Sequence, residues 1–154
     1  MDLEVHAKYL GSLIGNFHSL EFILRAFLQK LPSARPYGLP EGTDVYAFGV
    51  GRELPENEMT SYDSLGQLID KYNNEMRKRK EKELDQTLVE IRDALAHGRV
   101  SAEQPDRPLR LVKFSKPSQG RVKVTFNEIM SEEWFLAQRK RVYDALQSVY
   151  NNAS

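Results

Sequence analysis

The chain has 154 residues, which suffices for one compact domain and is short for two of typical size. Its 22 basic and 22 acidic residues cancel, so no global field draws the protein to nucleic acid or to a membrane. The absence of cysteine excludes disulfides, thiolate zinc sites, iron–sulfur clusters and cysteine nucleophiles. We expect one helical domain over residues 1–154.

The first residues, MDLEVHAKYL, lack the basic start and the apolar core of a secretory signal. No uncharged apolar run approaches the ~18 residues that a membrane helix needs. The expectation is therefore a soluble, cytoplasmic protein without membrane contact.

Residues 3–31 repeat apolar side chains at spacings of three and four, which predicts a long amphipathic helix ended by Pro32 and Pro36. Beside this stripe, His18, Glu21 and Arg25 are interpreted as an exposed ion-pair stripe. The alternative is that Glu21 or Arg25 reaches a functional site. The apolar stripe consists of Leu10, Leu13, Ile14, Phe17, Leu20, Leu24, Phe27, Leu28 and Leu31.

The next segment, residues 32–60, is rich in Pro and Gly and contains one short apolar stretch, VYAFGV. A loop of this length is either functional or contains a small element of its own. Its aromatic residues, Tyr37 and Tyr46 among them, either anchor the loop to the core, which we favour, or stack on nucleic-acid bases.

A second helix is expected to begin at Ser61 as its N-cap, because Leu65, Leu68, Ile69 and Tyr72 form an apolar face. Asn73 and Asn74 weaken the helix, and we predict a break near residues 74–80. One continuous bent helix stays an alternative, since neither Gly nor Pro occurs between Gln67 and His97. The charged run at residues 77–82 is interpreted as a solvated segment rather than a guide for a polyanion.

A third helix is predicted from Leu84, Leu88, Ile91 and Leu95, with Gly98 as a left-handed C-terminal cap. The alternating stretches LRLVKF and RVKVTF flank the turn-like KPSQG and predict a β-hairpin over about residues 109–126. Ser131, Glu132 and Glu133 mark the start of a last helix, in which Trp134 is expected in the core or an interface. Its apolar stripe is Phe135, Val142, Leu146 and Val149. The expected fold is mainly α, a four-to-five-helix bundle with this hairpin before the last helix.

The sequence RDALAHGR ends the third helix. On a helical wheel of 100° per residue, Val89 and Ala96 occupy the centre of a second face, separate from the core stripe. This second face has small residues at its centre and polar residues at its edges. Arg92 borders this face on one side, and Asp93 with His97 borders it on the other. The small central residues suit a close helix contact, and a homodimer through Val89 and Ala96 would double the polar cluster. The imidazole of His97 is a group suited to proton transfer, while Arg92 and Arg99 are cations suited to a phosphate.

The run Arg92-Asp93-Ala94-Leu95-Ala96-His97-Gly98 at a helix end resembles the motif of the HEPN superfamily of small helical bundles. The resemblance implies a dimeric, metal-independent endoribonuclease of toxin or defence type, without a cofactor and with an antitoxin protein as a further partner. The implied catalytic residues are Arg92, Asp93 and His97, with Arg99 as a substrate-binding residue. RNA would be cleaved by attack of a 2′-hydroxyl on the adjacent phosphate. The alternative within the same family is a catalytically silent module that binds a nucleotide or a protein partner.

Two other interpretations of the motif stay open. In the first, Arg92 and His97 have no functional role and belong to a solvated, salt-bridged helix end, where cations interact favourably with the helix dipole. Glu90, Asp93 and His97 lie within about 60° of one another on the wheel, which is compatible with a carboxylate–imidazole metal site.

Overall fold

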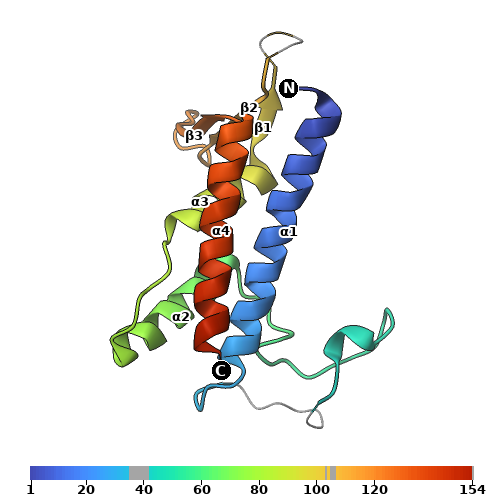
Figure 1. Ribbon diagram of the computed structural model, residues 1–154, viewed down its shortest axis with the longest axis vertical. Coiled ribbons are helices and arrows are strands. Elements are labelled where there is room, and N and C mark those ends of the chain that lie inside the picture. The colour runs from blue at the N-terminus through green and yellow to red at the C-terminus, as the bar shows by residue number, and fades with distance from the viewer. Residues whose placement is uncertain (35–41, 103, 105–106, 154) are drawn as a thin grey trace. The chain divides into compact units, whose positions relative to one another are not determined.

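The structure is a computed structural model, and it describes residues 1–34, 42–102, 104 and 107–153 (Figure 1). The chain is mainly helical and carries antiparallel strands before the last helix, which confirms the predicted fold class. No helix among the described residues has the length and apolarity to cross a membrane. The chain forms two compact units, Met1–His18 with Asp85–Asp144, and Ser19–Leu84 with Ala145–Ser154. Its main elements are α1 (Leu3–Leu28), α2 (Leu65–Arg79), α3 (Thr87–His97), β1 (Arg99–Ser101), β2 (Arg110–Phe114), β3 (Val124–Ile129) and α4 (Glu132–Asn152).

The first helix follows the predicted apolar stripe closely. Leu13, Leu20 and Leu24 are fully buried, as the spacing of three and four residues requires. Ile14 is the exception, because 36% of its surface is exposed at the edge of the stripe. The helix ends at Leu28, three residues before the predicted boundary at Leu31.

Arg25 on α1 does not belong to an exposed ion-pair stripe. Its guanidinium donates hydrogen bonds to the carbonyl oxygens of Glu58 (3.1 Å) and Asp63 (2.9 Å) and to the hydroxyl of Ser61 (2.8 Å). The planar fork of an arginine suits three acceptors at once. Arg25 therefore fastens the segment before α2 to the first helix.

The loop before α2 contains a short 3₁₀ helix, η1 (Val45–Ala47), which begins after Asp44. The carboxylate of Asp44 accepts a hydrogen bond from the backbone N–H of Tyr46 at 2.9 Å. The ring of Tyr46 lies 5.8 Å from that of Phe22 on α1, but the two residues are 60% and 49% exposed. Tyr46 therefore contacts the surface of α1 and not the core, which differs from the expectation. Tyr37 and Pro36 lie outside the described residues.

The N-cap of α2 is Ser64 rather than the predicted Ser61. Ser64 accepts from the backbone N–H of Gln67, and the Gln67 side chain accepts from the backbone N–H of Ser64. This capping box satisfies two donors at the helix start, which Ser61 cannot reach from three residues further away. The predicted apolar face of α2 is confirmed, since Leu65, Leu68, Ile69 and Tyr72 are all buried.

The second and third helices, α2 and α3, are separate, so the alternative of one bent helix is wrong. The break between them lies at residues 80–86. It comes later than the predicted residues 74–80 because Asn73 does not disrupt the helix. Lys80 ends α2 in the left-handed conformation, with φ 57°. In the charged run at residues 77–82, Arg77 pairs with Glu83 at 3.0 Å, in agreement with a solvated segment.

The start of α3 is held by Asp85. Its carboxylate accepts hydrogen bonds from the backbone N–H (2.9 Å) and the hydroxyl of Thr87. Arg141 of α4 donates to the same carboxylate at 2.8 Å and also to the Thr87 hydroxyl. These hydrogen bonds, first those from Thr87 and then that from Arg141, lower the pKa of Asp85 below its ordinary value.

The core face of α3 differs from the wheel at two positions. Leu88 and Ile91 are buried as predicted, but Ala94 is fully buried and Leu95 is only half-buried. Leu84 is buried too, although it precedes the helix. The buried face is thus shifted by roughly one residue toward Ala94.

The three strands form an antiparallel sheet in the order β1-β2-β3. The predicted hairpin corresponds to β2 and β3, in which Leu111 pairs with Glu128 and Val112 with Asn127. Its turn places Gln119 and Gly120 at φ 52° and 71°, the pattern of a two-residue hairpin turn. The short strand β1 was not predicted; Arg99 of β1 pairs with Val112 of β2.

The predicted start of α4 is confirmed. The Ser131 hydroxyl accepts a hydrogen bond from the backbone N–H of Trp134 at 3.1 Å, as an N-cap does. Phe135 is fully buried and contacts the rings of His6 (5.3 Å) and Trp134 (5.2 Å). Of the predicted apolar stripe, Phe135, Val142 and Val149 are fully buried, and Leu146 is half-buried.

Candidate functional site at the end of helix α3

The RDALAH motif occupies the last two turns of α3. The side chains of Arg92 and Asp93 are 39% and 40% exposed, and His97 is exposed at the helix end. Between them lie Val89, which is half-buried, and Ala96, which is exposed. The polar cluster and the small-residue face derived from the wheel are therefore both accessible to solvent.

Asp93 lies between two cations. Its carboxylate is 3.6 Å from the guanidinium of Arg92 and 4.0 Å from the ammonium of Lys113 on β2. Arg92 also makes a further contact within the chain. Because these pairs are partly exposed, each stabilises the fold by well under about 1 kcal/mol. The two cations offset the negative charge that Asp93 places beside the motif.

His97 makes no hydrogen bond or ion pair with any of the described residues. Its imidazole at the end of α3 is therefore available to a ligand or to a second chain. The structure brings Arg92 and Asp93 together, and among the residues it describes none is a hydrogen-bond or ion-pair partner of His97. On the helix, Arg92 and His97 are about 140° apart, so they border the Val89–Ala96 face from opposite sides.

Gly98 joins α3 to β1 and fixes the position of His97 relative to the sheet. Its φ of −74° and ψ of 170° are extended, so the predicted left-handed cap is wrong. The glycine is needed for space: a Cβ here would lie 2.4 Å from the Ala94 carbonyl oxygen and 2.6 Å from Cδ1 of Leu111. The chain passes directly into a strand, which a left-handed residue would prevent.

Arg99 is the first residue of β1, and it lies on the other face of the sheet from Lys113. Its guanidinium carbon is 5.5 Å from the ring centre of Phe114, a cation–π contact. Because Arg99 pairs with Val112, it shares a face with Phe114, whereas Leu111 and Lys113 point to the face that packs on α3. Arg99 therefore extends the motif toward the open face of the sheet.

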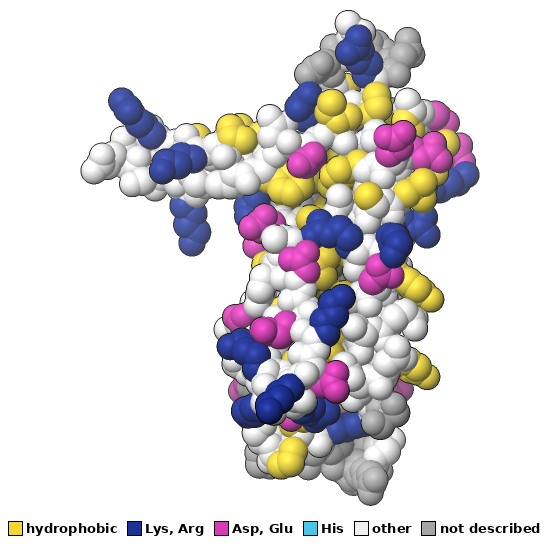
Figure 2. All heavy atoms as spheres, turned by 60° about the vertical axis from the view of Figure 1, so that its left-hand side comes forward, with side chains coloured by type: hydrophobic (Ala, Val, Ile, Leu, Met, Phe, Trp, Pro, Cys, Tyr) yellow, Lys and Arg dark blue, Asp and Glu magenta, His cyan; other side chains and the backbone are white. Residues whose placement is uncertain are grey.

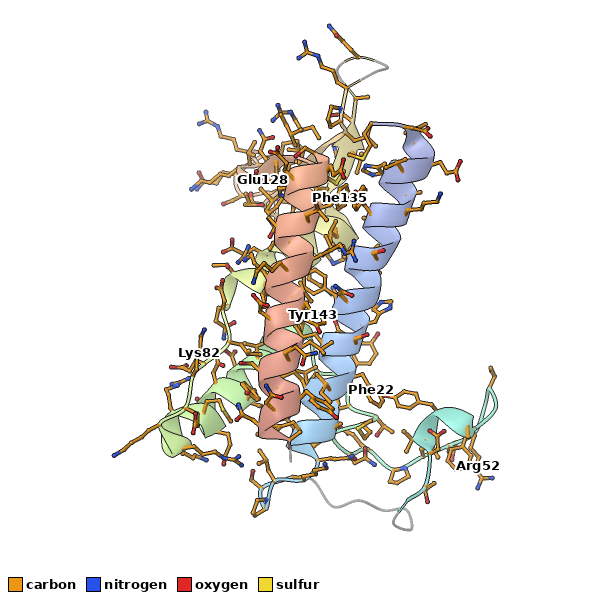
Figure 3. The ribbon with its side chains drawn as sticks, in the orientation of Figure 1. Phe22, Arg52, Lys82, Glu128, Phe135 and Tyr143 are labelled. Carbon is orange, nitrogen blue, oxygen red and sulfur yellow. The ribbon has the colours of Figure 1, made fainter. Side chains whose placement is uncertain are left out.

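The cations of the hairpin were not among the predicted site residues. Residues 113–127 contain Lys113, Lys116, Arg121 and Lys123 and no acidic residue, in a chain whose net charge is zero. The alternation of LRLVKF could have predicted the position of Lys113, because it puts Lys113 on the same face as the apolar Leu111. In the structure this face packs on α3. Figure 2 shows Lys and Arg side chains spread along a projecting arm of the surface. Figure 3 labels Glu128, the acidic residue of β3, which pairs with Leu111 near the end of β3, away from the hairpin turn.

The predicted alternative of a metal site at Glu90, Asp93 and His97 finds no support in the geometry. Within residues 1–34, 42–102, 104 and 107–153, no group of three or more His, Asp or Glu side chains is arranged to hold a metal ion. The carboxylate of Asp93 instead faces the two cations described above.

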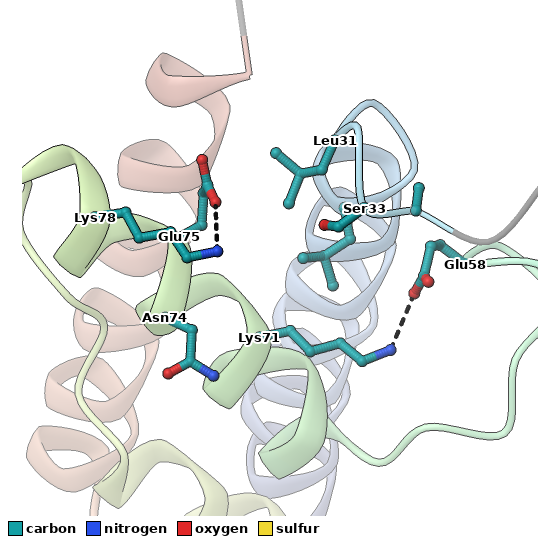
Figure 4. Close-up of a pocket in the computed structure, with 9 residues that line it drawn as sticks. Leu31, Ser33, Glu58, Lys71, Asn74, Glu75 and Lys78 are labelled. Atoms are coloured by element: carbon teal, nitrogen blue, oxygen red, sulfur yellow. Dashed lines mark hydrogen bonds and ion pairs between the residues drawn. The ribbon is translucent and has the colours of Figure 1, made fainter.

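A second candidate site is a cavity of about 230 Å³ in the other compact unit, between the end of α1 and α2 (Figure 4). Its charged side chains pair with one another: Lys71 lies 3.2 Å from Glu58, and Lys78 lies 3.7 Å from Glu75. Burial acts to lower the pKa of Lys71, but hydrogen bonds to Asp63 and Glu58 outweigh it and raise the pKa. The charged side chains that line the cavity are thus already paired with one another. The end of α3 is therefore the stronger candidate.

Comparison of the chain with protein-family models, with curated proteins and with solved structures found no match.

Proposed function

We propose that this chain is a HEPN-like, metal-independent endoribonuclease that acts as a homodimer. The observation that carries the proposal is the accessible arrangement at the end of α3. The exposed His97, which has no partner among the described residues, and the half-exposed Arg92 flank the small-residue face of Val89 and Ala96. Two chains that meet through this face would place two copies of the pair around one cleft. RNA is the proposed substrate, and an antitoxin is a further proposed partner.

The chemistry follows from the residue types. In one chain of the dimer His97 accepts the proton of a ribose 2′-hydroxyl as its oxygen bonds to the adjacent phosphorus. The bond from phosphorus to the 5′-oxygen breaks, and the protonated His97 of the second chain supplies a proton to that leaving oxygen. Arg92 stabilises the added negative charge on the phosphoryl oxygens. The products are a 2′,3′-cyclic phosphate and a 5′-hydroxyl, and no metal ion enters the step.

The neutralisation of Asp93 supports the binding of a phosphate here. An uncompensated carboxylate would repel an anion, but Arg92 and Lys113 both lie within 4.0 Å of this one. Asp93 in turn pairs with Arg92 at 3.6 Å, and the role we assign to it is to orient this guanidinium.

The test is cleavage of a fluorogenic RNA by the purified protein in excess EDTA, with mass spectrometry of the product ends. We expect His97→Ala and Arg92→Ala each to lower the rate by at least about 100-fold, as loss of a proton-transfer group or of a charge-stabilising group does. His18→Ala is the matched control, because His18 is an exposed histidine on α1. No cleavage by the wild type, or equal cleavage by His97→Ala, contradicts the proposal.

A further inference from the structure

The open face of the sheet and the β2–β3 hairpin form a continuous surface that begins beside the motif. Arg99 follows His97 by two residues and pairs with Val112, after which β2 continues toward the hairpin turn. At ~3.3 Å per residue, the strand carries the surface more than ~10 Å beyond Arg99 before the turn. The surface thus begins two residues along the chain from His97.

The outer part of the hairpin is positively charged without compensation. Lys116, Arg121 and Lys123 are exposed, and they make no ion pair within the part of the chain that the structure describes. The backbone holds them in place: Ser115 and Lys123 face each other through a 2.8 Å hydrogen bond, and Ser118 pairs with Arg121. Such a row of free cations is complementary to a phosphate backbone.

The charged run of α2 is different, although it is richer in Lys and Arg. Arg77 pairs with Glu83, and Arg79 and Lys78 both pair with Glu75, at distances from 2.8 to 3.7 Å. Acidic neighbours thus cancel much of its field. Of the two basic segments, the hairpin is therefore the one suited to bind a polyanion.

The open face of the sheet also offers apolar and aromatic contacts. Phe114, Val124 and Ile129 are 38%, 57% and 46% exposed. The strand pairing puts all three on the face of Arg99, whose guanidinium already covers the Phe114 ring. Unstacked bases bind to such aromatic and guanidinium planes, whereas the bases of a duplex are stacked inside the helix.

We propose that the open face of the sheet and the hairpin bind single-stranded RNA, with phosphates on Lys116, Arg121 and Lys123 and a base on the Arg99–Phe114 pair. This inference deepens the proposed ribonuclease function and rests on it for the identity of the substrate. The hairpin is then a binding arm, and it holds the RNA strand next to the phosphodiester bond that is cleaved at His97.

The test measures binding separately from cleavage. The probe is a fluorescein-labelled 2′-O-methyl oligoribonucleotide, which has no free 2′-hydroxyl and cannot be cleaved by the proposed route. Anisotropy titrations at several salt concentrations compare the wild type with the triple variant Lys116→Ala, Arg121→Ala, Lys123→Ala. The matched control, Arg77→Ala, Lys78→Ala, Lys82→Ala, removes the same charge from the end of α2 and the segment that follows it. Circular dichroism and thermal melting establish that both variants are folded.

We expect the hairpin variant to bind about tenfold or more weakly at 0.1 M salt, with a salt-dependence slope reduced by about 2, and the α2 variant to bind like the wild type. Phe114→Ala should weaken binding about tenfold with an unchanged slope, because it removes a stacking surface and no charge. The same sequence presented as a duplex should bind more weakly than the single strand.

Equal binding by the hairpin variant and the wild type overturns the inference. So does equal or tighter binding of the duplex, or a wild type that binds vesicles of anionic lipid but not the oligonucleotide. A wild type that binds through the hairpin but never cleaves RNA contradicts the ribonuclease function and leaves the binding surface intact. Unchanged binding by His97→Ala supports the separation of the binding arm from the catalytic pair.

Discussion

The side chain of Asn73, in the middle of α2, is hydrogen-bonded to both backbone groups of Leu84. Its carbonyl oxygen accepts from the Leu84 N–H at 2.7 Å, and its amide nitrogen donates to the Leu84 carbonyl oxygen at 3.0 Å. Both residues are buried. The amide therefore pairs with both backbone groups of Leu84, and it fixes this end of the segment that follows α2.

Asn73→Ala should destabilise the protein by about 2–3 kcal/mol, because it leaves a buried N–H and a buried carbonyl of Leu84 without partners. The measurement is urea unfolding followed by circular dichroism. Asn74→Ala is the control: Asn74 is exposed, and alanine favours a helix, so the free energy of unfolding should stay equal or rise slightly. Equal stability of the two variants would show that the hydrogen bonds to Leu84 contribute nothing.

The sequence predicted the parts of the fold that local patterns specify. The apolar stripes of α1, α2 and α4 and the alternation of β2 and β3 are properties of neighbouring residues. Asn73 shows where this fails. Asparagine lowers helix propensity, so the sequence suggested a break, but its partner Leu84 lies 11 residues away and cannot be seen from propensity.

Strand β1 and Gly98 escaped prediction for the same reason. Three residues are too few to show alternation, and β1 exists because Arg99 pairs with Val112 on a distant strand. A glycine after a helix is usually a left-handed cap, yet Gly98 is required by the approach of Leu111. Of the candidate site, the sequence supplied Arg92, Asp93, His97 and Arg99, while Lys113 joined them only through the sheet.

Gly98→Ala should destabilise the protein by about 1–3 kcal/mol, even though its φ of −74° is allowed for alanine. The added Cβ would meet a backbone oxygen and the Leu111 side chain, and the backbone oxygen cannot move without shifting the end of α3. Thermal unfolding measures the effect. Gly11→Ala on α1 is the control, since nothing lies within 4 Å of its added Cβ and alanine favours a helix. A Gly98→Ala protein as stable as the Gly11→Ala protein would refute the steric argument.

The stability of the protein should fall below about pH 6.5, and His6 should account for part of this fall. His6 is 7% exposed, its Nδ1 has no hydrogen-bond partner among the described residues, and burial lowers its pKa below the ordinary value of 6.5. The unfolded chain then binds a proton that the folded chain resists, so stability is lost as the pH falls through the unfolded pKa. Unfolding midpoints in urea at pH 7 and pH 5 measure it. His6→Gln should reduce the difference by up to about 1 kcal/mol, whereas His18→Gln should not; the reverse result would exclude His6.

The proposed dimer makes Ala96 a sensitive position. An arginine there would separate the two α3 faces by its length and bring two like charges together, so we expect Ala96→Arg to raise the dimer dissociation constant by at least about 100-fold. Ribonuclease activity should be lost with the dimer, although Arg92 and His97 are unchanged. Sedimentation velocity over a range of concentrations, with cleavage measured on the same samples, tests both effects. Ala137→Arg makes the same change at an exposed position of α4 and should alter neither. An Ala96→Arg protein that stays dimeric would place the interface elsewhere, and one that is monomeric but fully active would show that one copy of the motif suffices.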